Sequence, residues 1–78
     1  MKKIAVLSIM VHDRNSVSRV NQLLHEACDD ILGRMGVPIK SHDLSIISII
    51  IETGDDVFNH LIESLQELPG VRVKYIQE

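Results

Sequence analysis

The sequence of 78 residues has almost no aromatic side chains, with one Phe, one Tyr and no Trp. It therefore lacks the stacking platforms on which single-stranded nucleic acids bind. The eight Lys and Arg residues are scattered and the formal net charge is −3, which argues against a basic nucleic-acid-binding face. We therefore do not expect this chain to bind nucleic acid directly.

Cysteine and long apolar runs are also scarce. Cys28 is the only cysteine, so no disulfide can form within the chain and nothing indicates secretion. The longest apolar run, residues 44–51, contains two serines and falls short of the roughly 18 residues of a membrane span. Residues 4–11 lack the cleavage site of a signal peptide. These absences predict a cytoplasmic protein with no membrane association.

The abundant residues are aliphatic and β-branched, and their order predicts four strands. Residues 4–11 and 44–52 are apolar on both faces, which is typical of central strands. Residues 71–76 alternate between apolar and charged side chains. Residues 31–39 contain two glycines and Pro38, which favour an irregular edge strand.

Two amphipathic helices separate these strands. Apolar side chains recur at spacings of three and four over residues 16–29 and 56–68. The order βαββαβ predicts a single α+β domain over residues 1–78, a ferredoxin-like sandwich with an antiparallel four-stranded sheet and two helices on one face.

Two helices cover only one face of such a sheet, so the other face needs a partner. We expect a homo-oligomer, a dimer or a tetramer, because soluble monomers rarely expose a contiguous apolar patch. In the strand over residues 44–52, one alternating set faces the helices and the other faces the partner. The set expected at the oligomer interface, together with two residues of the neighbouring edge strand, is Ile47, Ile49, Ile51, Val37 and Pro38.

Two sequence segments carry a family resemblance. The segments Ile31–Pro38 (ILGRMGVP) and Leu68–Val73 (LPGVRV) resemble those of the small regulators of the iron-only hydrogenase system. This resemblance spans essentially the whole chain. It implies an ACT-like domain, related in fold to the sensing domain of the nickel-responsive repressor. It also implies an association with the [FeFe]-hydrogenase maturation proteins, which are therefore candidate partners.

The sequence departs from these relatives at their binding sites. The first strand begins at residue 3 or 4, so we expect no ribbon–helix–helix DNA-binding domain before it. The nickel ligands of the repressor include histidines on its second strand and a cysteine on its third strand. In this sequence the strand over residues 31–39 has no histidine and the strand over residues 44–52 has no cysteine, so the nickel site does not carry over. Residues 12–16 contain no glycine, whereas amino-acid-binding ACT domains usually have one in this loop.

No catalytic or metal-binding motif is present. Of the histidines, only His25 lies near Cys28, three residues apart on one helix, and a metal would need further ligands. Cys28 falls on the apolar stripe of that helix, so we expect a buried thiol. The acids at positions 29 and 30 would not activate it as a nucleophile. We therefore expect no metal, no cofactor and no enzymatic activity.

Arg34 is the most distinctive charged residue, because it lies between Gly33 and Gly36 in an apolar segment. One interpretation is a ligand-binding site, since glycine allows a ligand to approach the backbone closely. That site would consist of His25, Gly33, Arg34 and Gly36. The alternative is a structural salt bridge from Arg34 to an acid such as Asp30 or Glu52.

The leading functional hypothesis is a ligand-sensing, oligomeric regulatory module of the iron-only hydrogenase system. A small ligand is a further candidate partner. Two alternatives remain open from the sequence: a small metal-handling or enzymatic protein with a site between subunits, and a purely structural interaction subunit.

Overall fold

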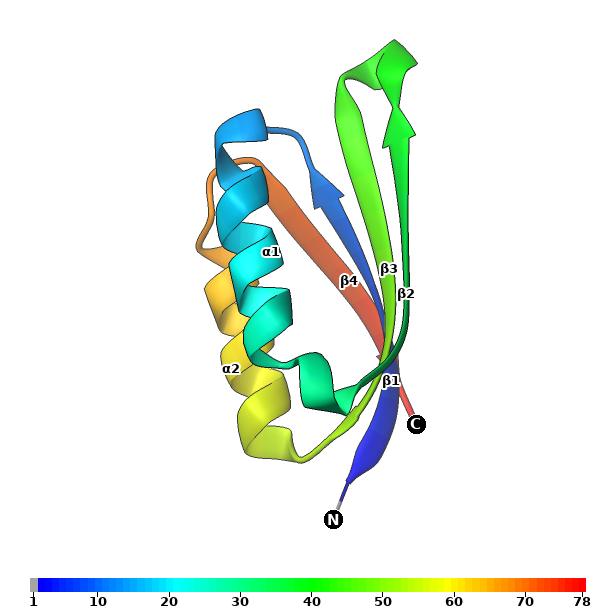
Figure 1. Cartoon of the computed structure of the whole chain (residues 1–78). Coiled ribbons are helices and arrows are strands. Elements are labelled where there is room, and N and C mark those ends of the chain that lie inside the picture. The colour runs from blue at the N-terminus through cyan, green and yellow to red at the C-terminus, as the bar shows by residue number, and fades with distance from the viewer. Residues whose placement is uncertain (1) are drawn as a thin grey trace.

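The computed structural model describes residues 2–78 as four strands and two α-helices in the order βαββαβ (Figure 1). Short 3-10 helices cover residues 14–16, 28–30 and 40–42. The main elements are β1 (Lys3–Val11), α1 (Val17–Glu26), β2 (Ile31–Ile39), β3 (Leu44–Thr53), α2 (Asp55–Gln66) and β4 (Val71–Gln77).

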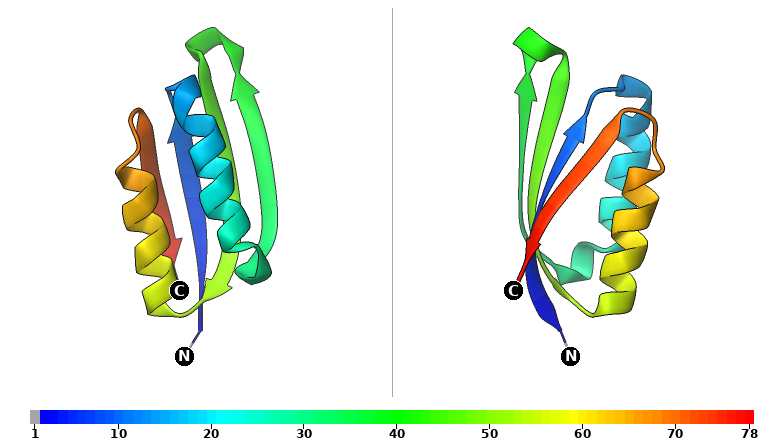
Figure 2. Two further views of the ribbon diagram at one scale, coloured as in Figure 1. Left: turned by 60° about the vertical axis from the view of Figure 1, so that its left-hand side comes forward. Right: turned by 180° about the vertical axis from the view of Figure 1, so that it is seen from behind.

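The four strands form one antiparallel sheet in the order β2-β3-β1-β4. Both helices lie on the same side of this sheet, and the other side is bare (Figure 2). The predicted ferredoxin-like α+β fold is therefore confirmed, with β1 and β3 at the centre. The edge strand β2 carries Pro38 and a bulge between Ile31 and Gly33, as its glycines and proline indicate.

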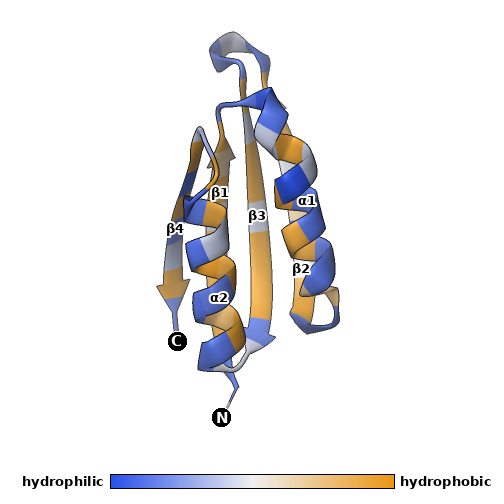
Figure 3. Cartoon of the chain, turned by 90° about the vertical axis from the view of Figure 1, so that its left-hand side faces the viewer, coloured by the Kyte–Doolittle hydropathy of each residue, from blue (hydrophilic) through white to orange (hydrophobic). Residues whose placement is uncertain are grey.

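The core lies between the sheet and the two helices. Leu7 and Ile9 of β1 are fully buried, because α1 and α2 turn their apolar stripes toward the sheet (Figure 3). On the helices, the buried side chains are Val20, Leu23, Leu24, Phe58, Leu61, Ile62 and Leu65. One face of the central strands therefore meets the helices and forms a single aliphatic core.

The prediction that Ile47, Ile49 and Ile51 form an oligomer interface is wrong about the face on which they lie. Ile49 and Ile51 are fully buried and Ile47 is 8% exposed. They pair across the sheet with Ala5, Leu7 and Ile9, which lie under the helices. Because side chains alternate along a strand, the available face belongs to the other set, which includes Ile46 and Ile50.

The helix α1 is shorter than predicted, and this difference moves Cys28 to the surface. The α-helix ends at Glu26, and a 3-10 turn over residues 28–30 follows it. The tighter turn breaks the 3.6-residue period on which the predicted burial of Cys28 rested. Cys28 is exposed, so the predicted buried thiol is wrong.

A close contact joins the β1–α1 loop to the α2–β4 loop. The amide of His12 donates to the carbonyl oxygen of Gly70 at 2.7 Å, and Ser16 Oγ donates to the carbonyl oxygen of Pro69 at 2.7 Å. Gly70 has a φ of 69°, and a Cβ there would lie 2.8 Å from the Cβ of Asp13. Glycine is required at this position both for its backbone conformation and for the close approach.

We predict that Gly70→Ala lowers the free energy of unfolding by about 1–3 kcal/mol, the cost of a left-handed non-glycine residue, with a further loss from the contact to Asp13. Urea denaturation measures this change. Gly36→Ala is the matched control, because a Cβ there meets nothing within 4 Å, and its effect should stay within about 0.5 kcal/mol. Equal effects of the two substitutions would contradict the requirement for glycine at position 70.

Candidate functional site

An open cleft lies between α1 and the hairpin formed by β2 and β3. It consists of two adjoining hollows of about 450 and 210 Å³ that share Val11, Val17, Pro38 and Ser45. We call it the α1–hairpin cleft. The tip of the hairpin extends beyond the N-terminal start of α1 (Figure 1), so the helix does not cover the hairpin along its whole length.

The smaller hollow has an apolar floor. Val11 and Ile47 are buried side chains of the central strands, and Val17 is the first residue of α1. Gly36 also lines the hollow and pairs with Ile47 on the face that points toward the helices. A Cβ on Gly36 would meet nothing within 4 Å, so the absence of a side chain at Gly36 leaves this space open.

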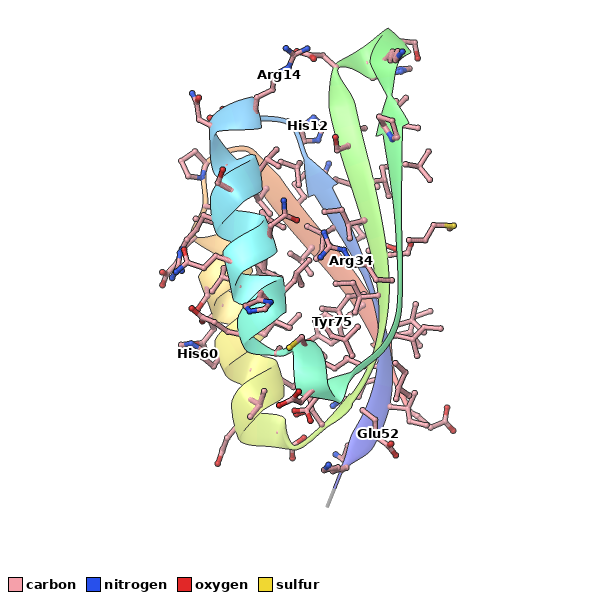
Figure 4. The ribbon with its side chains drawn as sticks, in the orientation of Figure 1. His12, Arg14, Arg34, Glu52, His60 and Tyr75 are labelled. Atoms are coloured by element: carbon pink, nitrogen blue, oxygen red, sulfur yellow. The ribbon has the colours of Figure 1, made fainter. Side chains whose placement is uncertain are left out.

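Arg34 crosses one end of the cleft. It pairs with Ile49 across the sheet, which places its side chain on the helix face of β2. The side chain extends from β2 toward α1 (Figure 4), and Nη2 donates to Asn21 Oδ1 at 2.6 Å. Among residues 2–78, the ion pairs involve Lys3, Arg14 and Arg19 but not Arg34. The positive charge of Arg34 therefore faces a neutral partner.

The other end of the cleft is crossed by an ion pair. Arg14 Nη2 lies 2.9 Å from Asp43 Oδ1, joining the start of the helical layer to the tip of the hairpin. Asp43 adopts the left-handed conformation, with a φ of 49°, that turns the chain into β3. Both side chains are largely exposed, so the pair contributes about 0–1 kcal/mol. The carboxylate of Asp43 is therefore already paired with the guanidinium group of Arg14 and is less available to a cationic group of a ligand.

The cleft is basic although the chain as a whole is acidic. Its lining contains Arg14, Arg34 and Lys40 but only one acid, Asp43. The formal charge of these groups is thus about +2 at neutral pH, against −3 for the whole sequence. This local excess of positive charge favours an anion.

The structure brings together only part of the ligand-binding set predicted from the sequence. Arg34 and Gly36 line the same hollow. His25 is exposed on α1, one turn beyond Asn21, and is not part of the lining. Gly33 follows the bulge and pairs with Ile50, which turns its position toward the opposite face of the sheet.

Sequence reasoning missed Asn21. It lies on the exposed side of α1, and its contact with Arg34 spans 13 residues, so no local pattern indicates it. The alternative of a salt bridge from Arg34 to Asp30 or Glu52 is wrong for the described residues, since Arg34 is in no ion pair there. Asp30 instead accepts a hydrogen bond from Thr53 Oγ1 at 2.8 Å.

The other titratable residues do not gather into a site. Across residues 2–78, no three His, Cys, Asp or Glu side chains are grouped so as to hold a metal ion. Cys28 Sγ lies 3.9 Å from Asp29 Oδ1 at the surface. His12 and His60 project from different elements (Figure 4).

In the part of the chain that the structure describes, neither helix has the length and apolar character needed to cross a bilayer.

A second candidate surface is the side of the sheet that no helix covers. Val6 and Ile50 pair at its centre and are 44% and 45% exposed. We call this surface the open sheet face. By strand alternation and register, it consists of Ile4, Val6, Ser8 and Met10 of β1, Ile46, Ser48, Ile50 and Glu52 of β3, Met35 and Val37 of β2, and Arg72, Lys74 and Ile76 of β4.

The chemistry of the open sheet face changes from its centre to its rim. The centre is aliphatic, apart from Ser8 and Ser48, which lie directly opposite each other. The charged residues lie outside it: Arg72 and Lys74 belong to the edge strand β4, and Glu52 lies near the end of β3. An apolar centre with a polar rim is the usual anatomy of a protein–protein interface.

Comparison with solved structures supports the assignment of the fold. The chain is similar to the uncharacterized protein TM1266 from Thermotoga maritima, with 37% sequence identity and a TM-score of 0.93 over 99% of this chain and 98% of that one. It is also similar to the ACT domain from the GTP pyrophosphokinase of Chlorobium tepidum, at 16% identity and a TM-score of 0.79, covering 97% of this chain and 100% of that one. The C-terminal domain of MgtC from Mycobacterium tuberculosis gives 12% identity and a TM-score of 0.76, covering 97% and 87%.

These comparisons differ in what they establish. At 16% and 12% identity, the likeness to the ACT and MgtC domains shows an ACT-like fold and nothing more. No curated protein matches the chain. The family model described as "TM1266-like: Iron-only hydrogenase system regulator, putative" matches residues 3–75. Since this match spans nearly the whole sequence, the chain belongs to the TM1266-like family, to which that description applies.

Proposed function

We propose that this chain is a non-catalytic regulatory module that self-associates through its open sheet face and responds to a small ligand. The regulatory role rests on membership of the TM1266-like family. The observation that carries the proposal is the open sheet face itself, on which Val6 and Ile50 remain almost half exposed at the centre of the sheet.

Exposure of this face is costly for a single chain. Burying an aliphatic side chain such as Val or Ile contributes about 1.5–3 kcal/mol, and soluble monomers rarely leave such residues in a contiguous patch. A domain of this length also has a small core and marginal stability. A partner that covers Val6, Ile50 and Ile76 would supply the missing burial.

The composition of the face favours a second copy of the same chain over an unrelated protein. Obligate homodimer interfaces resemble a domain core cut in half, and the centre of this face is built from Ile, Val and Met. The energetic centres of other interfaces are enriched in Trp, Tyr and Arg, which are absent from this centre. The small side chains of Ser8 and Ser48 allow a second sheet to approach closely.

The charged rim supports the same arrangement. Arg72 is next to Met10, whereas Glu52 is next to Ile4, so the two charges lie toward opposite ends of β1. A two-fold axis that crosses the strands would place the basic end of one sheet over the acidic end of the other. A self-complementary surface of this kind needs no other partner.

The remaining hypotheses from the sequence receive less support. Within residues 2–78, no group of three or more His, Cys, Asp or Glu side chains supports a metal-handling site. Hydrogenase maturation proteins remain proposed partners on the basis of the family. Val37 stays in the proposed interface, because its pairing with Ile46 places its side chain on the open sheet face, although Val37 also lines the smaller hollow. Pro38 pairs with Ser45 on the face toward the helices and leaves the proposed interface.

We predict that Val6→Glu dissociates the assembly to a species of 8.8 kDa, because burying an unpaired carboxylate in an apolar interface costs several kcal/mol. Light scattering coupled to size-exclusion chromatography measures the mass. The wild-type chain should show at least twice the monomer mass. Circular dichroism should stay unchanged, since Val6 points away from the core.

Val57→Glu is the matched control, because Val57 is also 44% exposed but lies on α2. Its mass should equal that of the wild type. If Val6→Glu does not fold, Ile76→Glu on the edge strand tests the same face. A wild-type chain that is monomeric at all accessible concentrations, or variants of the open sheet face that fold and keep the wild-type mass, would refute self-association through this face.

A further inference from the structure

We infer that the α1–hairpin cleft binds a small aliphatic carboxylate, which Arg34 holds by its guanidinium group. The inference deepens the proposed function by naming the class of ligand. The regulatory meaning of this ligand rests on the proposed function. Binding of the ligand to the cleft does not require the chain to self-associate.

The charge and the hydrogen-bond donors of Arg34 favour a carboxylate as the ligand. A guanidinium group has five N–H donors in a planar fork, and the structure assigns one hydrogen bond to them, from Nη2 to Asn21 Oδ1. That bond orients the side chain across the cleft without neutralising it. A carboxylate matches the remaining donors with two parallel hydrogen bonds.

The shape and lining of the cleft favour a ligand with a short aliphatic chain. The hollow beside Arg34 has a volume of about 210 Å³. Val11, Val17 and Ile47 provide an apolar floor next to the guanidinium group. A short branched hydrocarbon chain fits this floor, and its carboxylate reaches Arg34. Inorganic phosphate has no apolar part to place there.

The charges that line the cleft disfavour an amino acid as the ligand. An amino acid would bring an ammonium group, which the positive charges of Arg34, Arg14 and Lys40 repel. Asp43 is the only acidic residue in the lining, and it is already 2.9 Å from Arg14. The cleft therefore favours a simple carboxylate over the corresponding amino acid.

The position of the cleft gives the ligand a route to the open sheet face. By strand alternation, Arg34 and Gly36 of β2 point toward the helix side of the sheet, whereas the side chains of Met35 and Val37 point toward the opposite side. Val37 belongs to both surfaces, because it also lines the smaller hollow. A ligand that fixes Arg34 therefore acts on a strand that also belongs to the proposed interface. Ligand binding and self-association would then be coupled reciprocally.

The test uses 4-methylpentanoate, which is leucine without its amino group. The ligand is titrated into the ¹⁵N-labelled full chain, and the backbone amide shifts are followed by NMR. We expect saturable shifts at Asn21, Arg34 and Gly36. The neutral analogue 4-methylpentanamide and inorganic phosphate should bind at least about tenfold more weakly, since a hydrogen bond to a charged group contributes about 1.5–3 kcal/mol. Leucine should bind no more tightly than 4-methylpentanoate.

Two substitutions separate the charge from the shape of the cleft. Arg34→Gln should weaken binding at least about tenfold, and the matched control Arg19→Gln, on the exposed side of α1, should leave the affinity unchanged. Gly36→Val should also weaken binding, because a Cβ at Gly36 meets nothing within 4 Å and the added side chain would occupy part of the smaller hollow. The mass of each variant without ligand, measured separately, reports on self-association.

Three results would overturn the inference. They are the absence of saturable shifts at the cleft, equal affinity for the acid and the amide, and tighter binding of leucine or phosphate than of 4-methylpentanoate. Loss of binding with an unchanged mass would leave self-association intact. A monomeric chain that still binds 4-methylpentanoate would refute only the proposed assembly.

Discussion

The constraint on which this structure depends is that two helices cover only one face of a four-stranded sheet. The pairing of β1 with β3 sets Leu7 beside Ile49 and Ile9 beside Ile47, so these side chains share one aliphatic layer beneath the helices. The same register sets Val6 beside Ile50 on the other side. Because a shift by one residue would exchange the two layers, the core and the open sheet face are fixed together.

The sequence predicts the fold well, because turn residues and hydrophobic periodicity agree for every element. Pro38 and the two glycines identify β2 as an edge strand, and alternation in β4 identifies the other edge. The sequence does not, however, predict which face of β3 lies under the helices. Ile46 and Ile50 are as hydrophobic as Ile47 and Ile49, so composition alone does not decide which pair lies under the helices.

The candidate site was less predictable, because it depends on contacts between distant elements. Gly36 and Arg34 stand out in the sequence, but the contact of Arg34 with Asn21 arises only when α1 lies across the sheet. Cys28 illustrates the same limit locally. Its predicted burial assumes a helix through residue 29, and the 3-10 turn after Glu26 changes the direction of its side chain.

The irregularities of β2 have a consequence for the kind of assembly that the chain can form. Pro38 has no N–H group to offer a further strand, and the bulge between Ile31 and Gly33 interrupts the other half of the same edge. Addition of the β4 edge of another copy to β2 would be a heterologous contact and would extend the sheet from copy to copy. Pro38 and the bulge disfavour such an open filament at this edge, and the self-association proposed above uses the face of the sheet instead.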